Sequence, residues 1–449
     1  MKEKSKRLIP IIACVVTICV LTCLFPFLFS ANTPAYPDPS APADGGTNNS
    51  DTAALDARFR ELLEAINRYS YYPNVEYSPE LAAALLASTG DPYCQYFTKE
   101  QLDDYTTDLS GNFVGIGVMI ESTKTDGGEP ALRLLSVFTD SPAQASGLLP
   151  GDLIVAVDGK ASSEFESLSD MTAAVRGEAG TEVVLTVERK GVDDPMTVTV
   201  TRGACVKDTV YSERLLCGET ALGYVRVTDF DEITTEQFIR AVSALETEGV
   251  SAFIFDLRYN GGGYLDTVNE MLAYLLPDGN LCSVDHASSL LTDYTLYAEG
   301  DTIYQTGRDG YYRKSEAFIH QISVPSAVLV NGATASAAEL FTAGLRDYAA
   351  EGKIPPVTIV GENTYGKGCM QSVFPLPNGD YIKVTIALYT PPCGVNYHEV
   401  GVAPTVPVTA NDKTSADLYL KETPGSSTLP DGATDTVLVK AIARLTASE

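Results

Sequence analysis

Two residues in the carboxyl-terminal half of the chain could together perform nucleophilic chemistry. Ser336 follows an apolar, β-rich run at 324–330 and a tight turn at 331–335, and it begins a stretch of helical periodicity that extends to Ala350. A hydroxyl at a helix start has unpaired backbone N–H groups and the positive helix end beside it, which suits a nucleophile whose reaction builds an oxyanion. A serine in this position is also a common helix cap, so its place alone does not decide its role.

A lysine supplies the base that such a serine needs. Lys367 lies between Gly366 and Gly368, in the stretch at 361–368 that directly follows a second apolar run at 356–360. Lysine can accept the serine proton if burial lowers its pKa from about 10.4 toward roughly 7 to 8. The alternative bases are three histidines in stretches without a nucleophile motif: His286, His320 and His398. We therefore expect Ser336 and Lys367 to form a catalytic pair.

The surroundings of Lys367 also fit a phosphate-binding loop. The spacing from Gly361 to Gly366 and Lys367 matches that pattern, except that Gly368 stands where a serine or threonine should bind Mg²⁺. The stretch at 370–390 alternates like β-strands, whereas a phosphate loop would continue into a helix. Nucleotide binding is therefore the weaker interpretation.

Three stretches together resemble the core motifs of the carboxyl-terminal processing peptidases, which are serine proteases with a Ser-Lys pair. They are Asp256–Gly263, Asn331–Glu339 and Gly361–Gln371, and the resemblance extends from about Asp51 to Val408. By position it implies that Ser336 is the nucleophile, Lys367 the general base and Gln371 the residue that orients the lysine.

The same resemblance implies an oxyanion hole. One donor would be the amide of Ala337, which follows the nucleophile, and the other a glycine amide of the turn at 260–263. The choice between Gly262 and Gly263 stays open. Gly261 stands where the family commonly has proline, so we expect a looser turn here.

Residues 110–203 form a module of their own. Strands are predicted at 114–120, 132–137, 153–157 and 182–188, with helices at 141–148 and 171–176. This order and its glycine pattern resemble a PDZ domain, which captures a carboxyl terminus as an added strand and binds its carboxylate with backbone N–H groups. The resemblance implies a groove lined by Val114, Gly115, Ile116 and Gly117.

The amino-terminal 30 residues are predicted to anchor the chain in a membrane. Four basic residues among the first seven precede 22 uncharged residues at 8–29, and about 20 suffice to span a bilayer. The positive-inside rule then places everything after Ser30 on the extracytoplasmic side. A cleaved signal peptide is the alternative, although Phe29-Ser30-Ala31 is a poor cleavage site, and Cys23 is a weak match to a lipid-attachment site.

Composition excludes several partners. The 449 residues include 31 basic and 59 acidic side chains, and the net charge of −28 repels nucleic acid. Nine cysteines show no metal-binding spacing, so we expect no metal, and the proposed chemistry needs no organic cofactor. The predicted partners are protein or peptide substrates with free carboxyl termini and the membrane; assembly into a homo-oligomer stays open.

Helical patterns precede the PDZ-like module. One apolar stripe comprises Leu55, Phe59, Leu62, Leu63 and Ile66. The segment at 91–97 is similar to the family's connection into its inserted domain, and structural packing is enough to explain it.

The sequence as a whole predicts an α/β (mixed α+β) protein with a helical amino-terminal part and an inserted PDZ domain. The expected function is that of a membrane-anchored extracytoplasmic serine endopeptidase; the alternative is a non-catalytic peptide-binding scaffold with a protease-like core. The predicted divisions are 1–30 membrane anchor or signal, 31–50 flexible linker, 51–109 helical region, 110–203 PDZ domain, 204–408 protease core and 409–449 carboxyl-terminal tail with a short helix.

Overall fold

A six-stranded sheet forms the centre of the carboxyl-terminal half. The computed structural model describes residues 49–69, 78–288, 291–307, 310–316 and 320–447. In this sheet, β10 pairs antiparallel with β11. From β11 onward, neighbouring strands are parallel and follow the order β11-β12-β17-β18-β21. The strands are β10 Val210–Cys217, β11 Thr220–Val227, β12 Ala252–Asp256, β17 Ser326–Val330, β18 Val357–Gly361 and β21 Val406–Pro407. The two predicted apolar runs that precede Ser336 and Lys367 are confirmed as the strands β17 and β18.

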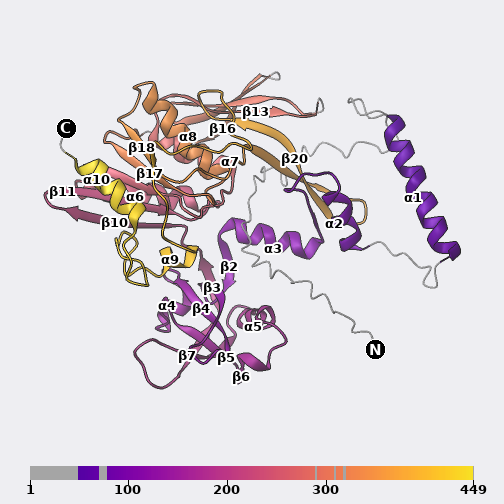
Figure 1. Cartoon of the computed structure of the whole chain (residues 1–449), viewed down its shortest axis with the longest axis horizontal. Helices are drawn as coiled ribbons and strands as arrows, with labels where there is room; N and C mark the ends of the chain where they lie inside the picture. The colour runs from indigo at the N-terminus through magenta and orange to yellow at the C-terminus, as the bar shows by residue number, and fades with distance from the viewer. Residues whose placement is uncertain (1–48, 70–77, 289–290, 308–309, 317–319, 448–449) are drawn as a thin grey trace, which may run out of the picture.

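Helices cover both faces of this sheet (Figure 1). Phe253 and Phe255 of β12 pack in the cluster formed with α6, α7 and α8, whereas Ile254 between them packs in the cluster that contains α10. Because both faces are buried, the strand sequence is continuously apolar and does not alternate with polar residues. The helices are α6 Thr234–Thr247, α7 Leu265–Leu275, α8 Ala337–Ala350 and α10 Thr436–Thr446.

A second, antiparallel sheet joins distant parts of the chain. Its longest strand, β20, pairs with β19 along one edge and with β1 and β13 along the other, and β14, β15 and β16 extend the sheet beyond β13. The pairing with β1 sets Gln95 directly opposite Lys383. The strands are β1 Gln95–Phe97, β13 Gly279–His286, β14 Tyr294–Glu299, β15 Thr302–Gly307, β16 Gly310–Glu316, β19 Cys369–Pro375 and β20 Tyr381–Thr390.

The PDZ-like module has its own sheet and core. A two-stranded ribbon, β2 with β9, links it to the rest of the chain, and its main sheet has the order β3-β4-β5-β7-β8 with β6 beside β5. The single strand predicted at 114–120 is wrong: Gly117 adopts φ +80°, which ends β2 and redirects the chain into β3. The elements are β2 Asn112–Gly115, β3 Val118–Lys124, β4 Pro130–Val137, α4 Pro142–Ala145, β5 Leu153–Val157, β6 Lys160–Ala161, η2 Ser162–Glu164, α5 Leu168–Val175, β7 Glu182–Glu188, β8 Met196–Thr201 and β9 Gly203–Val206.

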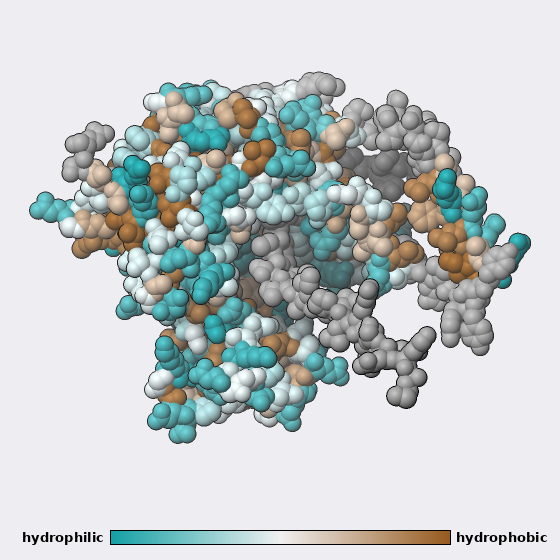
Figure 2. Space-filling view, viewed as in Figure 1, coloured by the Kyte–Doolittle hydropathy of each residue, from teal (hydrophilic) through white to brown (hydrophobic). Residues whose placement is uncertain are grey.

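The amino-terminal region is helical, as its pattern predicts. The apolar stripe on α1 is nonetheless exposed: Leu55, Phe59, Leu62 and Leu63 are each 42 to 55% accessible, and apolar surface is visible on that helix in Figure 2. No helix within the described ranges is both long and apolar enough to cross a bilayer, and the predicted span at 8–29 and linker at 31–50 lie outside them. The helices are α1 Asn49–Tyr69, α2 Pro79–Ala87 and α3 Lys99–Ser110, and a short α9 Ser415–Tyr419 lies in the carboxyl-terminal tail.

A buried ionic cluster ties the carboxyl-terminal tail to the end of β12. Arg258 is fully enclosed, and its guanidinium donates to Asp256 (Nη2 to Oδ2, 2.6 Å) and to Asp435 (Nη2 to Oδ2, 2.8 Å). Lys421 Nζ also donates to Asp435 Oδ2, at 2.7 Å. Burial alone would raise the pKa of Asp435, but the charges of Arg258 and Lys421 hold it well below its usual range. The carboxyl-terminal tail therefore fixes the position of Arg258, which precedes the glycine turn at 260–263.

Asp435→Ala is expected to lower the free energy of unfolding by about 3 to 5 kcal/mol, because it removes the carboxylate paired with buried Lys421 and one of the two to which Arg258 donates. Since the folded-state pKa of Asp435 is depressed, its contribution is present above the unfolded pKa near 4 and is lost as the pH falls through the folded value. Urea unfolding at pH 7 measures the loss, with exposed Asp194→Ala as the control, which should stay within about 0.5 kcal/mol of the parent. Equal stability of both variants would contradict a bracing role.

Candidate active site

Three loops at one edge of the parallel sheet form the candidate site. They follow β12, β17 and β18, and because these strands are adjacent and parallel, their carboxyl ends lie side by side. The loops are bonded to one another: the Ala335 amide donates to the Asn260 carbonyl at 2.9 Å, and the Tyr365 amide donates to the Thr334 carbonyl at 2.9 Å. The candidate serine, lysine and glycines therefore belong to one bonded assembly.

Ser336 occupies a strained and enclosed position just before α8. Its side chain and backbone are 1% exposed, and its φ of +56° is unusual for a residue with a Cβ. The first-turn amide of Glu339 donates to the Ser336 carbonyl oxygen at 2.9 Å, and the Ser336 hydroxyl makes no cap bond to the helix. Instead, Ser336 Oγ lies 3.3 Å from the hydroxyl oxygen of Tyr389, within hydrogen-bond distance. Ser336 therefore occupies the N-cap position of α8 without its hydroxyl bonding to the helix.

Lys367 is equally buried, at 1% exposure. Its ammonium lies 4.6 Å from the centroid of the Tyr93 ring, and its carbonyl oxygen accepts from the Tyr389 hydroxyl at 2.9 Å. The Tyr389 hydroxyl thus contacts both Ser336 and Lys367. The chain then continues as β19, a strand, so the helix that a phosphate loop requires is absent from this described stretch.

Glu339 holds the two loops together, a role that the sequence pattern did not assign. Its Oε2 accepts the amides of Ser336 at 2.8 Å and Lys367 at 2.7 Å, and its Oε1 accepts from the Thr364 hydroxyl at 2.5 Å and the Gly366 amide at 2.7 Å. Burial raises the pKa of Glu339, while these four donors act in the opposite direction. The spacing Ser-x-x-Glu, which is typical of a capping box, was the available signal.

Gln371 is buried on β19, near the predicted base. Its amide nitrogen donates to Cys369 Sγ at 3.2 Å and to Thr385 Oγ1 at 3.1 Å. Cys369 is a buried free thiol, and burial raises its pKa. The role of Gln371 in orienting Lys367 stays a prediction.

The glycine turn after β12 lies beside the loop of Ser336. Gly262 and Gly263 have φ values of +106° and +145°, and a Cβ on Gly263 would come within 2.3 Å of the Phe230 carbonyl oxygen, so only glycine fits there. The Gly262 amide donates to Asn260 Oδ1 at 2.8 Å. Ala337 is the first residue of α8, where a backbone N–H has no acceptor within the helix.

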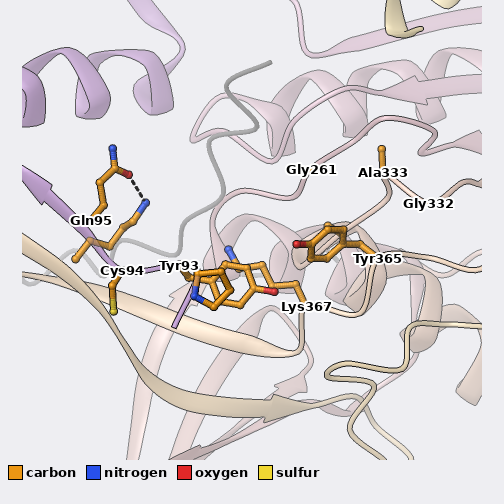
Figure 3. Close-up of a pocket in the computed structure, with 11 residues that line it drawn as sticks. Tyr93, Cys94, Gln95, Gly261, Gly332, Ala333, Tyr365 and Lys367 are labelled. Atoms are coloured by element: carbon orange, nitrogen blue, oxygen red, sulfur yellow. Dashed lines mark hydrogen bonds between the residues drawn. The ribbon is translucent and has the colours of Figure 1, made fainter. Parts of the chain in front are cut away.

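A cavity of about 590 Å³ opens onto Lys367, as Figure 3 shows. One wall comes from the Ser336 and Lys367 loops, and Tyr365 lies on the same side. The other wall comes from the segment at 92–95. Structural packing, which was expected to explain this segment, is therefore not its only role, since it also lines the cavity. None of the three histidines lines it. The lining residues are Pro92, Tyr93, Cys94, Gln95, Gly261, Gly332, Ala333, Ala335, Tyr365, Lys367 and Lys383.

The predicted peptide-binding residues lie where β2 passes into β3. Ile116 is buried in the core of the module, whereas Val114 is 48% exposed. The carbonyl oxygens of Ile116 and Gly117 accept backbone amides of Ala143 and Phe138. β3, which follows, is the edge strand of its sheet and could accept an added strand.

Comparison with known proteins agrees with this architecture. Residues 221–408 match the model of peptidase family S41, and residues 135–189 match a PDZ domain. A carboxyl-terminal-processing protease of Picosynechococcus sp. is 30% identical over 328 residues, which cover 72% of this chain and 71% of the relative. The carboxy-terminal processing protease CtpA of Bacillus subtilis is 29% identical over 357 residues, covering 78% of this chain and 69% of the relative.

A solved structure shares the fold. A putative S41 protease from Bacteroides fragilis superposes with a TM-score of 0.52 at 17% identity, covering 86% of this chain and 97% of that one. Mixed α/β architecture, the family match and the inserted PDZ domain agree with the resemblance seen in the three core motifs. The chain belongs to the carboxyl-terminal processing proteases of peptidase family S41, a family of serine proteases.

Proposed function

We propose that this chain is a serine endopeptidase in which Ser336 is the nucleophile and Lys367 the general base. The observation that carries the proposal is that one oxygen atom, Glu339 Oε2, accepts the backbone amides of both residues. The Tyr389 hydroxyl also contacts both. These contacts join the backbones of Ser336 and Lys367, which belong to different loops. They support the proposal that the hydroxyl of one and the amine of the other act together, as a nucleophile and its base must.

The reaction follows from this arrangement. Burial favours the neutral amine of Lys367, which takes the proton of Ser336 as the hydroxyl oxygen attacks the peptide carbonyl. The resulting ammonium gives its proton to the leaving amine. Water then attacks the acyl-enzyme with Lys367 again as base. We assign the orientation of Lys367 to the carbonyl oxygen of Gln371, since the amide nitrogen of that side chain already donates to two other groups.

Backbone amides would stabilise the oxyanion. The Ala337 amide is the first donor, because it follows the nucleophile and lies at the positive end of α8. The second donor comes from Gly262 or Gly263. Gly262 would first have to release Asn260 Oδ1, to which its amide now donates.

The substrate class is inferred from the PDZ domain and from the names of the relatives. An edge strand preceded by the glycine loop at 115–117 suits an extended peptide with a free carboxyl terminus. We infer that the PDZ domain holds the end of a protein substrate while the Ser336 site cleaves it.

We also propose that residues 1–30 anchor the chain, with the catalytic part on the extracytoplasmic side. The basic first seven residues and the 22 uncharged residues that follow support this orientation. Protease accessibility of the catalytic part in intact cells tests it, and protection of that part would contradict it.

A serine-reactive probe and an unstructured protein substrate together test the proposed chemistry. Mass spectrometry should locate one covalent adduct on Ser336, and Ser336→Ala should lose both the adduct and the cleavage of the substrate. Exposed Ser163→Ala is the matched control and should keep both. Amidating the carboxyl terminus of the substrate should slow its cleavage, because the PDZ loop then has no carboxylate to bind.

Two outcomes would contradict the proposal. Equal cleavage by the parent and by Ser336→Ala would remove the serine mechanism, and an absence of cleavage by the parent would favour the peptide-binding scaffold. Loss of activity on chelation would indicate a metallopeptidase, whereas the proposed mechanism predicts that activity survives a chelator.

A further inference from the structure

A second lysine enters the cavity that contains Lys367. Lys383 lies on β20 and is 7% exposed, and its ammonium donates to Gln95 Oε1 at 3.0 Å, the bond drawn in Figure 3. The ammonium also lies 5.4 Å from the Phe97 ring centroid and 5.2 Å from that of Tyr105. An amide oxygen and two ring faces stabilise its positive charge without neutralising it.

The fold fixes this ammonium in place. The β1–β20 register sets Gln95 opposite Lys383, and Tyr105 is supplied by α3. Within the described residues no carboxylate oxygen lies within 4 Å of Lys383 Nζ, so no ion pair cancels its charge. Lys383 is therefore a buried positive group that shares a cavity wall with the proposed base.

Other titratable groups face the two lysines from each neighbouring element. Asp91 is the acid of the segment before β1, and its carboxylate accepts from the Tyr93 amide at 2.8 Å. The carboxylate of Glu339, on α8, is enclosed by its four donors. The remaining titratable groups include phenols and thiols: Tyr93 and Cys94 before β1, Tyr105 on α3, Tyr365 and Cys369 on either side of Lys367, and Tyr389 on β20.

We propose that Lys383 is a positioning residue that acts through Lys367: its fixed ammonium disfavours a second positive charge in the cavity and so keeps the Lys367 amine ready to accept the Ser336 proton. This inference rests on the proposed Ser336–Lys367 mechanism. Burial first, and then the charge of Lys367, lower the pKa of Lys383 to about 8, so Lys383 remains mostly charged at neutral pH. Like charges in one enclosed site lower each other's affinity for protons, and the pair titrates as a unit.

The dependence of kcat/KM on pH tests the inference. A general base must be unprotonated, so kcat/KM should rise with pH until Lys367 is neutral. Lys383→Met removes the second charge, so Lys367 keeps its proton to higher pH. The part of the pH profile in which kcat/KM rises (the rising limb) should therefore shift to higher pH by about one unit. Lys383→Arg keeps the charge and should leave the limb near its original position. Exposed Lys440→Met is the matched control.

Two further measurements keep the test decisive. Gln95→Glu places a carboxylate beside the Lys383 ammonium and should move the limb in the same direction, even if Lys383→Met does not fold. The rate at which a serine-reactive probe labels Ser336 should shift with pH in parallel with kcat/KM, because labelling needs the same base but no PDZ-bound substrate.

Each result supports or overturns the inference. An upward shift in Lys383→Met or Gln95→Glu, with the limb preserved in Lys383→Arg, supports it. An unmoved limb overturns it, whether accompanied by a lower kcat or by a higher KM, since Lys383 would then be structural or would bind substrate. Loss of activity at every pH in a Lys383→Met variant that is folded also overturns it, because Lys383 itself would be the base. Activity that survives Ser336→Ala would instead refute the underlying mechanism.

Discussion

Lys367→Met should lower kcat/KM by roughly 10⁴-fold while leaving the protein folded. Methionine has nearly the length of lysine and suits a position that is 1% exposed, but it cannot accept the Ser336 proton. Removal of a buried ammonium should also leave the free energy of unfolding unchanged or slightly higher. Steady-state kinetics on an unstructured protein, with urea unfolding of the same samples, measures both effects.

The control for this prediction is Lys353→Met. Lys353 is an exposed lysine that pairs with Glu351 at the end of α8, so its loss should change kcat/KM by less than about twofold. If Lys367→Met keeps a tenth or more of the parent activity, another group removes the Ser336 proton. Lys383 would then be the first candidate, because it is the other amine that lines the cavity.

The motifs of the parallel sheet were predictable because each one follows its own apolar strand. Ser336 and Lys367 come after β17 and β18, and the glycine turn comes after β12. Local patterns located the strands, and the order β12-β17-β18, which they do not contain, brings the three loops to the same edge of the sheet. The resemblance to the peptidase family added roles that these patterns do not contain.

The far wall of the cavity was not predictable in the same way. Tyr93, Gln95 and Lys383 reach the site only because β1 pairs with β20, and residues so far apart in sequence leave no local signal of their register. A lysine within a strand such as β20 is by itself typical of an exposed face. Its burial depends on Phe97 and Tyr105, which come from different elements.

The PDZ domain shows the limit of alternation as a strand signal. Apolar and small residues alternate through 114–120, but Gly117 needs a left-handed φ and a Cβ there would come within 2.3 Å of Ser141 Cβ. Two strands replace the single predicted one as a result. On α1, periodicity predicted the helix correctly but did not show whether its apolar face would be covered.

Glu339→Gln should be the most damaging change at the site that removes neither member of the proposed pair. The carboxylate accepts four hydrogen bonds, two on each oxygen, from Ser336, Thr364, Gly366 and Lys367. An amide has only one acceptor oxygen, and its NH₂ group would face two donors that cannot bond to it. At about 1 to 3 kcal/mol for each of the two unpaired buried donors, we expect the free energy of unfolding to fall by roughly 2 to 6 kcal/mol.

Activity should fall further than stability explains. Glu339 sets the separation of the Ser336 and Lys367 backbones, and a shift of about 1 Å in such an arrangement can cost roughly 100-fold. We expect kcat/KM of Glu339→Gln to fall by about 10² to 10³ under conditions where the variant is still folded, with most of the loss in kcat. Exposed Glu351→Gln, at the other end of α8, should match the parent. If Glu339→Gln unfolds earlier yet labels Ser336 at the parental rate, Glu339 stabilises the fold without setting the geometry of the reaction. The link between the two loops would then have to come from Tyr389 and from the backbone bond between Tyr365 and Thr334.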